Sequence, residues 1–315
     1  MKRISYIFPI YNESGNIALL HKTISNVTDE IRKDYELEFI YVNDGSKDDS
    51  IKLLTKIAKD DPRVVIIDFA RNFGHQIAVT AGIDHATGDA LIIMDSDLQD
   101  PPSVSLELIK KWEEGFEVVY AQRRSRKDTV FKKMTANLYY RLLRKMASID
   151  IPRNTGDFRL IDRKVADEMR RYTEHSRFLR GMVSNIGFRQ VGVLFDRDER
   201  HSGETGYPLR KMLKFAADGI MGFSNTPLRL ISNIGFIMSG LSLLFILYSV
   251  YMRIFMPQSV VEGWTFIIIS IFLVGGIQLI MLGVLGGYIG RIYTEVQNRP
   301  LYSIRKITRS KQHKS

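Results

Sequence analysis

The amino-acid sequence predicts an α/β domain with a mostly parallel sheet, followed by a hairpin of two membrane-spanning helices. Short apolar runs of strand length alternate with segments whose apolar residues recur at helical spacing. Three of the runs end in polar loops that contain Asn12, Asp44 and the pair Asp95 and Asp97. This alternation is typical of a doubly wound sheet, in which such loops gather along one edge.

Five strands are expected, at residues 4–8, 37–42, 64–68, 90–94 and 118–121. The first helix carries an apolar stripe from Ile17 to Ile31, and we expect Asn12 to cap it. Ser46 is expected to cap the second helix, and residues 76–86 to form the third. The pattern therefore alternates strand and helix through the first part of the chain.

Asp95 and Asp97 follow the apolar strand 90–94, and Pro101 and Pro102 prevent that strand from continuing. Carboxylates at the carboxyl end of a parallel strand line the crevice where such sheets bind ligands. Their hard oxygens suit Mg²⁺ or Mn²⁺ that also holds phosphate. An acidic turn that simply closes a strand is the alternative for an isolated Asp-x-Asp.

Two long stretches, Ile231 to Met252 and Trp264 to Gly290, contain no charged residue. Each is long enough to cross a hydrocarbon core of about 30 Å as a helix. The second stretch is followed by seven basic residues: Arg291, Arg299, Arg305, Lys306, Arg309, Lys311 and Lys314. The positive-inside rule then predicts a multi-pass plasma-membrane protein with its first domain and both termini in the cytoplasm. Glycines in the second stretch favour a homo-oligomer.

Residues 131–147 and 207–226 combine an apolar helical face with flanking Lys and Arg residues. This pattern is typical of helices that lie in the headgroup layer of a membrane. An amphipathic helix packed on the sheet is the alternative for each.

The chain of 315 residues has a net charge of +10 and no cysteine. The charge favours anionic partners, and the absence of cysteine excludes disulfide bonds and thiolate chemistry. Nucleic acid is not expected as a partner, because the basic residues cluster around the membrane segments without an aromatic stacking platform. No Gly-x-Gly-x-x-Gly or P-loop motif is present, which argues against dinucleotide and P-loop enzymes.

Several motifs resemble those of the family 2 glycosyltransferases of GT-A fold, and within them the polyprenyl-phosphate hexose synthases. They lie at residues 9–13, 43–48, 71–76, 95–102, 155–160, 197–204 and 290–293. This subgroup includes relatives of dolichol-phosphate mannose synthase and of bactoprenol glucosyltransferases. Two positions depart from the pattern of many members, which have Lys in place of Gly206 and Glu in place of Gly287. The first departure removes one possible phosphate contact.

The resemblance implies a role for each motif. It assigns a divalent cation, Mg²⁺ or Mn²⁺, to Asp95, Asp97 and Gln99, although Asp95 can instead hold the ribose or reach the metal through water. It assigns the nucleotide-sugar to Pro9, Tyr11, Asn12, Glu13, Asp44 and Asp95. The candidate catalytic residues are Asp157, Asp97 and Arg200. Arg200 resembles the family's diphosphate-facing arginine. For Asp157 the roles of base, sugar ligand and electrostatic brace all stay open.

A lipid phosphate acceptor is already ionised near neutral pH, because its second pKa is about 6. It needs alignment by cations rather than a general base. The candidates for this task are Arg123, Lys132 and Lys133. Attack by its oxygen on the sugar carbon inverts that centre. His75 and His201 stand beside glycine-containing bends, where a structural role is the simpler interpretation.

We therefore expect transfer of a hexose, with UDP-linked glucose as the first choice, to undecaprenyl phosphate for cell-envelope glycosylation. N-acetylglucosamine, galactose, mannose and modified arabinose are alternative sugars. A processive polysaccharide synthase and a non-catalytic nucleotide-sugar scaffold are the competing functions. The predicted regions are a catalytic domain at 1–206, a juxtamembrane helix at 207–226, two spans (about 231–253 and 264–290) within 227–290, and a basic tail at 291–315.

Overall fold

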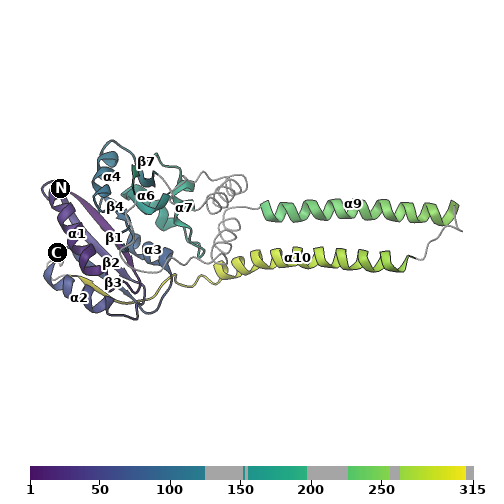
Figure 1. Ribbon diagram of the computed structural model, residues 1–315, viewed down its shortest axis with the longest axis horizontal. Helices are drawn as coiled ribbons and strands as arrows, with labels where there is room; N and C mark the ends of the chain where they lie inside the picture. Colours follow the sequence, from purple (N-terminus) through teal and green to yellow (C-terminus); the bar gives the residue numbers. More distant parts are fainter. Residues whose placement is uncertain (125–151, 153–154, 197–225, 256–262, 310–315) are drawn as a thin grey trace. The chain divides into compact units, whose positions relative to one another are not determined.

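The computed structural model describes residues 1–124, 152, 155–196, 226–255 and 263–309 (Figure 1). The chain divides into two compact units, and residues 300–309 belong to the first unit although they follow the second in sequence. The predicted interfacial helix at 131–147 lies outside the described residues, as do residues 207–225 of the juxtamembrane helix.

The first unit is built on an eight-stranded sheet in the order β7-β5-β6-β4-β1-β2-β3-β8. Its strands are β1 (Lys2–Ile10), β2 (Tyr35–Asn43), β3 (Val64–Phe69), β4 (Ala90–Ile93), β5 (Val118–Arg123), β6 (Thr155–Asp162), β7 (Gln190–Phe195) and β8 (Ile304–Arg309). The four central neighbours β4, β1, β2 and β3 run parallel to one another, and β5 runs parallel to β7. Both β6 and β8 run antiparallel to their neighbours. The sheet is thus mostly parallel, as predicted.

Apolar residues on both faces of the central strands explain why these runs fold as buried strands. In β1, Tyr6 and Phe8 belong to the core cluster shared with α1 (Ile17–Thr28), α2 (Ser50–Asp60) and α4 (Val104–Glu113). The intervening residue Ile7 faces the other side, where a Cβ on Gly82 would collide with its side chain. Gly82 lies in α3 (His75–His85), so this helix packs very close to β1.

Two capping predictions are wrong, although the helices exist. Helix α1 begins after Asn16 rather than after Asn12, and α2 begins after Asp49 rather than after Ser46. In both cases the polar loop is longer than predicted, because its side chains bind the neighbouring loop instead of the helix end. The apolar stripe that reaches Ile31 continues α1 into a 3-10 turn, Asp29–Ile31.

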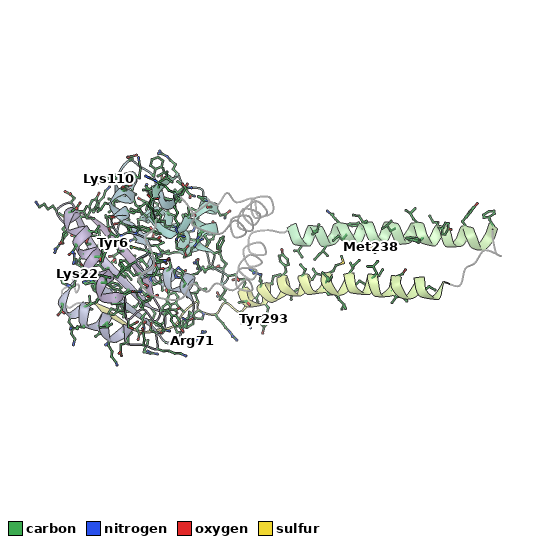
Figure 2. The ribbon with its side chains drawn as sticks, in the orientation of Figure 1. Tyr6, Lys22, Arg71, Lys110, Met238 and Tyr293 are labelled. Carbon is green, nitrogen blue, oxygen red and sulfur yellow. The ribbon has the colours of Figure 1, made fainter. Side chains whose placement is uncertain are left out.

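Two helices beyond β6 complete the described part of the first unit: α6 (Arg163–Arg171) and α7 (Leu179–Ile186). Asp162 caps α6 by accepting a hydrogen bond from the Lys164 amide. Helix α6 packs on α3 and α7, so α3, α6 and α7 form one group. In Figure 2 the buried Tyr6 lies inside this unit, while Lys22, Arg71 and Lys110 lie at its surface.

The last described residues form β8 at the edge of the sheet, within the region predicted as a basic tail. Backbone pairing joins β8 to β3, with Ile307 opposite Ile67. The Ala70 amide also donates to the carbonyl oxygen of Ser303 at 2.9 Å. Residues 303–309 are therefore a structural part of the sheet.

The second unit contains the long helices α9 (Thr226–Phe255) and α10 (Trp264–Val296). They pack against each other, with Gly235 next to Met281, and Figure 2 shows mostly carbon in their outward side chains. Within the described residues, one segment, Leu273–Val296, is apolar and long enough to cross a membrane by itself.

Candidate active site

The loops that follow β1 and β2 are joined by hydrogen bonds at the carboxyl edge of the sheet. The Asp44 amide donates to the Ile10 carbonyl at 2.8 Å, and the Asn12 amide donates to Ser46 Oγ at 3.0 Å. Asn12 Oδ1 accepts from the Lys47 amide at 2.8 Å. Asn12 adopts a left-handed backbone conformation with φ of 55°, which Asn tolerates better than most residues. The Asn12 side chain thus connects the two loops.

The other predicted nucleotide-site residues in the first loop lie beside this connection. Tyr11 is 44% exposed, so its ring is accessible for stacking. Glu13 donates its backbone amide to Ser50 Oγ at 3.1 Å and accepts from Asn16 Nδ2 through its carboxylate. Pro9, by contrast, is buried within β1.

Asp44 is only 2% exposed, and its carboxylate binds the loop that precedes α3. Its oxygens accept the Phe73 amide at 2.6 Å, the Gly74 amide at 2.9 Å and Asn72 Nδ2 at 2.9 Å. Burial raises the pKa of Asp44, although hydrogen bonds from the Phe73 and Gly74 amides oppose that rise. Asp44 therefore fastens the end of β2 to residues 72–74.

The loop after β4 brings two carboxylates to the same edge. The Met94 amide donates to the Ile7 carbonyl at 3.0 Å, and Ser96 Oγ donates to the Pro9 carbonyl at 3.2 Å. Leu98 has a φ of 57°, a rare conformation for a bulky residue, in the turn between Asp97 and Gln99. Asp97 Oδ1 accepts the Gln99 amide at 3.1 Å.

Asp95 lies in an excess of negative charge. The pKa of Asp95 is raised to about 6. Desolvation is the main cause; the positive charge of His75 opposes the rise, and the carboxylates of Asp157, Asp100 and Asp97 contribute to it. Among the described residues, Asp95 Oδ1 is buried without a hydrogen-bond partner, with His75 Nε2 at 3.7 Å. A cation would relieve both conditions.

The residues present fit a divalent cation whose coordination is completed by the phosphate oxygens of a bound molecule and by water. In the described ranges, no three acidic or histidine side chains converge closely enough to form a complete metal site. Mg²⁺ is commonly held by one or two carboxylates, with phosphate oxygens and water completing its shell. Asp95 and Asp97 can supply that pair, and Gln99 lies on the same turn.

Asp157, at the start of β6, lies beside Asp95 because β6 runs antiparallel to β4. The register pairs Ile93 with Arg159. Because the strands are antiparallel, two residues forward from Ile93 and two residues back from Arg159 bring Asp95 level with Asp157. The side chain of Asp157 is 9% exposed. Its oxygens accept hydrogen bonds from His75 Nε2 at 3.1 Å, Gln76 Nε2 at 3.1 Å and Arg180 Nε at 2.7 Å.

These donors determine the charge of Asp157. Burial acts to raise the pKa of Asp157, but the charge of Arg180 and the hydrogen bond from His75 hold it well below its usual range. For His75, desolvation acts to lower the pKa, yet the hydrogen bond to Asp157 and the charge of Asp95 raise it. Asp157 is therefore a carboxylate near neutral pH.

Arg123, at the end of β5, lies next to the turn that carries the metal-site candidates. Its Nη2 atom is 3.6 Å from Asp100 Oδ1, and the two side chains are 18% and 2% exposed. A Cβ on Gly156 would be 3.4 Å from the same Nη2 atom. The structure thus brings Arg123, Asp100 and the beginning of β6 together, whereas Arg200, Lys132 and Lys133 lie outside the described residues.

Four residues of this site were not among the predicted site residues: His75, Gln76, Asp100 and Arg180. The first three lie in the motifs at 71–76 and 95–102, which could have indicated them. No sequence signal indicates Arg180, because α7 reaches the site only through the tertiary fold.

Comparison with known proteins identifies the family. The model of the family described as "Glycosyl transferase family 2" matches residues 5–170, more than half of the 315-residue chain. The chain belongs to glycosyl transferase family 2. This family 2 glycosyltransferase is therefore an enzyme, and its mostly parallel sheet is a GT-A-like α/β fold, as the motifs predicted.

Relatives match the glycosyltransferase along nearly its whole length. An uncharacterized glycosyltransferase, YkcC, of Bacillus subtilis (strain 168) is 52% identical over 303 residues, which cover 96% of this chain and 93% of the relative. The bactoprenol glucosyl transferase of Shigella phage SfII is 40% identical, covering 96% of this chain and 98% of the relative. A prophage bactoprenol glucosyl transferase homolog of Escherichia coli (strain K12) is 39% identical, with 97% and 99% covered.

Proposed function

We propose that this enzyme transfers glucose from UDP-glucose to undecaprenyl phosphate, with inversion at the anomeric carbon. The observation that carries the proposal is the similarity, over nearly the whole chain, to relatives named bactoprenol glucosyl transferase. The site geometry supports it, because three loops and four neighbouring carboxylates gather at one edge of the sheet.

The donor nucleotide is assigned to the loops after β1 and β2. Tyr11 is exposed enough to stack on the base, while Pro9, Asn12 and Glu13 shape the loop around it. Asp44 is largely occupied by the amides of residues 72–74, so its contribution is to hold the pocket in shape as well as to contact the nucleotide.

The diphosphate is assigned to the turn after β4. Asp95 and Asp97, with Gln99, would hold Mg²⁺ or Mn²⁺ there, and Asp95 can alternatively contact the ribose. When bound, the cation stabilises the negative charge that develops on the departing diphosphate. Arg200 would add a positive charge to the same leaving group.

The acceptor is assigned to the basic side chains near β5. Arg123 is fixed beside Asp100, and it would align the lipid phosphate together with Lys132 and Lys133. An electron pair of the phosphate oxygen forms the new bond to C1 of glucose, while the C1–O bond to UDP breaks and its electron pair leaves with UDP. No base is required, because the phosphate monoester is already ionised.

The second unit is assigned to the plasma membrane. We infer that α9 and α10 form a two-span hairpin, since both helices expose large apolar side chains such as Phe236 and Leu279. The basic residues that follow Gly290 favour termini in the cytoplasm. The catalytic domain would then comprise residues 1–206 together with the strand β8, which pairs with β3, and the juxtamembrane helix residues 207–226. Self-association through the glycines of α10 belongs to the same proposal.

The test incubates purified protein with radiolabelled UDP-glucose and undecaprenyl phosphate, with and without EDTA. The expected product is a mild-acid-labile, β-linked lipid sugar whose formation requires the cation. Asp95→Asn and Asp97→Asn should each reduce the rate about 100-fold or more. Asp49→Asn is the matched control, because Asp49 is 68% exposed in the same unit.

Other outcomes would refute the proposal. Label in a polymer would indicate a processive synthase, and label in neither lipid nor polymer would indicate a binding scaffold. An α-linked product from the α-linked donor would contradict inversion, and an unchanged rate in both aspartate variants would contradict the assigned metal site.

A further inference from the structure

Asp157 and the side chains around it come from three separate elements of the fold. Asp157 lies on β6, His75 and Gln76 lie in the first turn of α3, and Arg180 lies in the first turn of α7. His75, Gln76 and Arg180 all donate to the Asp157 carboxylate, at 2.7–3.1 Å. Such convergence fixes the orientation of the carboxylate more firmly than any single hydrogen bond could.

Gln76 connects two of these elements directly. Its Nε2 group donates to Asp157, and its Oε1 atom accepts the backbone amide of Leu179, the first residue of α7, at 3.1 Å. The hydrogen bond from the Leu179 amide to Gln76 therefore fixes the start of α7, and it places the next residue, Arg180, beside the Asp157 carboxylate.

The number of donors limits what Asp157 can do. A carboxylate offers about four lone-pair sites, and three donors are already bound to this one. Room for about one further hydrogen bond remains. A substrate hydroxyl can use that site without losing its proton.

His75 also faces the second carboxylate. Its Nε2 atom is 3.1 Å from Asp157 Oδ2 and 3.7 Å from Asp95 Oδ1, and its side chain is 42% exposed. The imidazole therefore stands between the proposed diphosphate site and Asp157, with part of its surface open to a ligand.

We propose that His75, Gln76 and Arg180 are positioning residues that hold Asp157 as a hydrogen-bond acceptor for one hydroxyl group of the donor sugar. Asp157 then orients the sugar beside the diphosphate and removes no proton. This inference rests on the proposed function, because it takes a nucleotide-linked sugar as the ligand.

Two substitutions of His75 separate positioning from folding. His75→Gln keeps an amide donor at nearly the same reach as Nε2, whereas His75→Leu removes the donor. His85→Leu is the matched control, because His85 is the last residue of the same helix and lies outside the cluster. Arg180→Met with Arg171→Met as its control gives a second pair, since Arg171 is 75% exposed.

The readouts are kcat and donor KM with UDP-glucose at saturating undecaprenyl phosphate, together with the melting temperature. We expect His75→Leu to lower kcat about 10- to 100-fold, the loss expected for a hydrogen bond to a charged group. His75→Gln should recover activity to within about fivefold of the wild type, and both controls should stay within about twofold. A wild-type kcat in His75→Leu, or equal losses in the Leu and Gln variants, would overturn the inference.

A binding measurement separates this inference from the proposed function. If the wild type forms no lipid-linked glucose, the proposed function fails. The positioning role is then tested by measuring the affinities for UDP-glucose, UDP-galactose and UDP-N-acetylglucosamine and comparing each with the affinity for UDP alone. A sugar-dependent gain in affinity that His75→Leu loses and His75→Gln keeps supports the inference. The absence of any such gain in the wild type, or its persistence in His75→Leu, overturns it.

Discussion

Replacement of Tyr302 by Phe tests whether the segment after α10 is a structural part of the catalytic unit. The Tyr302 hydroxyl donates to Asp84 Oδ2 at 2.8 Å, and its ring stacks on Phe69 with centroids 5.2 Å apart. In the same segment, Arg305 Nη2 donates to the Ala70 carbonyl at 2.9 Å. The substitution removes the hydroxyl and keeps the ring.

The expected loss follows from these contacts. A hydrogen bond to a carboxylate contributes about 1.5–3 kcal/mol, and its partial exposure places this one near the lower limit, at about 1–2 kcal/mol. A unit of this size loses about 2–4 °C in melting temperature per kcal/mol. We therefore expect Tyr302→Phe to melt about 2–8 °C below the wild type. Tyr302→Leu should melt lower still, because an aromatic pair adds about 0.5–1.5 kcal/mol.

Thermal unfolding of the purified full chain, followed by scanning fluorimetry, measures this shift. Tyr293→Phe is the matched control, because Tyr293 is 65% exposed on α10 and its hydroxyl loss should leave the melting temperature unchanged. If Tyr302→Phe melts like the wild type, the contact between Tyr302 and Asp84 does not stabilise the sheet edge. The reasoning about residues 302–309 would then be refuted.

Three further predictions concern the sheet and its loops. Burial acts to raise the pKa of Asp61, but hydrogen bonds from His21 and Arg63 hold it well below its usual range. Ionised Asp61 should therefore stabilise the folded state above about pH 4, and this contribution should be lost as the pH falls further. The free energy of unfolding of Asp61→Asn, measured against pH, should accordingly be lower than that of the wild type near neutral pH and should fall less steeply in acid. Curves that match the wild type would contradict this. Gly82→Ala should destabilise by about 1–3 kcal/mol through collision with Ile7, more than the gain of about 1 kcal/mol in helix propensity; thermal melts should show partial rescue by Ile7→Ala. Asp44→Ala should lower the free energy of unfolding by about 2–4 kcal/mol, because two partly buried amides lose their acceptor. It should also weaken UDP binding, measured by calorimetry, and normal affinity would contradict the assigned nucleotide pocket.

The position of the polar loops could be predicted because it depends on the direction of the strands alone. Parallel strands bring their carboxyl ends to one edge, and the structure joins Asn12 to Ser46 and Ser96 to Pro9 there. The helix caps could not be predicted in the same way. An Asn or Ser side chain can bind either a helix end or a neighbouring loop. The neighbouring loop comes within reach only after the sheet has folded, so the sequence alone does not show which of the two is bound.

Strand direction itself limits what periodicity can reveal about this site. The apolar pattern of β6 is compatible with either direction, yet only the antiparallel direction brings its first residues to the carboxyl edge of the parallel strands. Asp157 reaches Asp95 for that reason, and the donors around it belong to elements far away in sequence. The resemblance could indicate Asp157, whereas the hydrogen bonds from Gln76 and Arg180 exist only after α3, β6 and α7 have packed. A carboxylate held in this way orients a ligand best when its donors stay rigid, so the helices that carry them are part of the active site as much as the loops are.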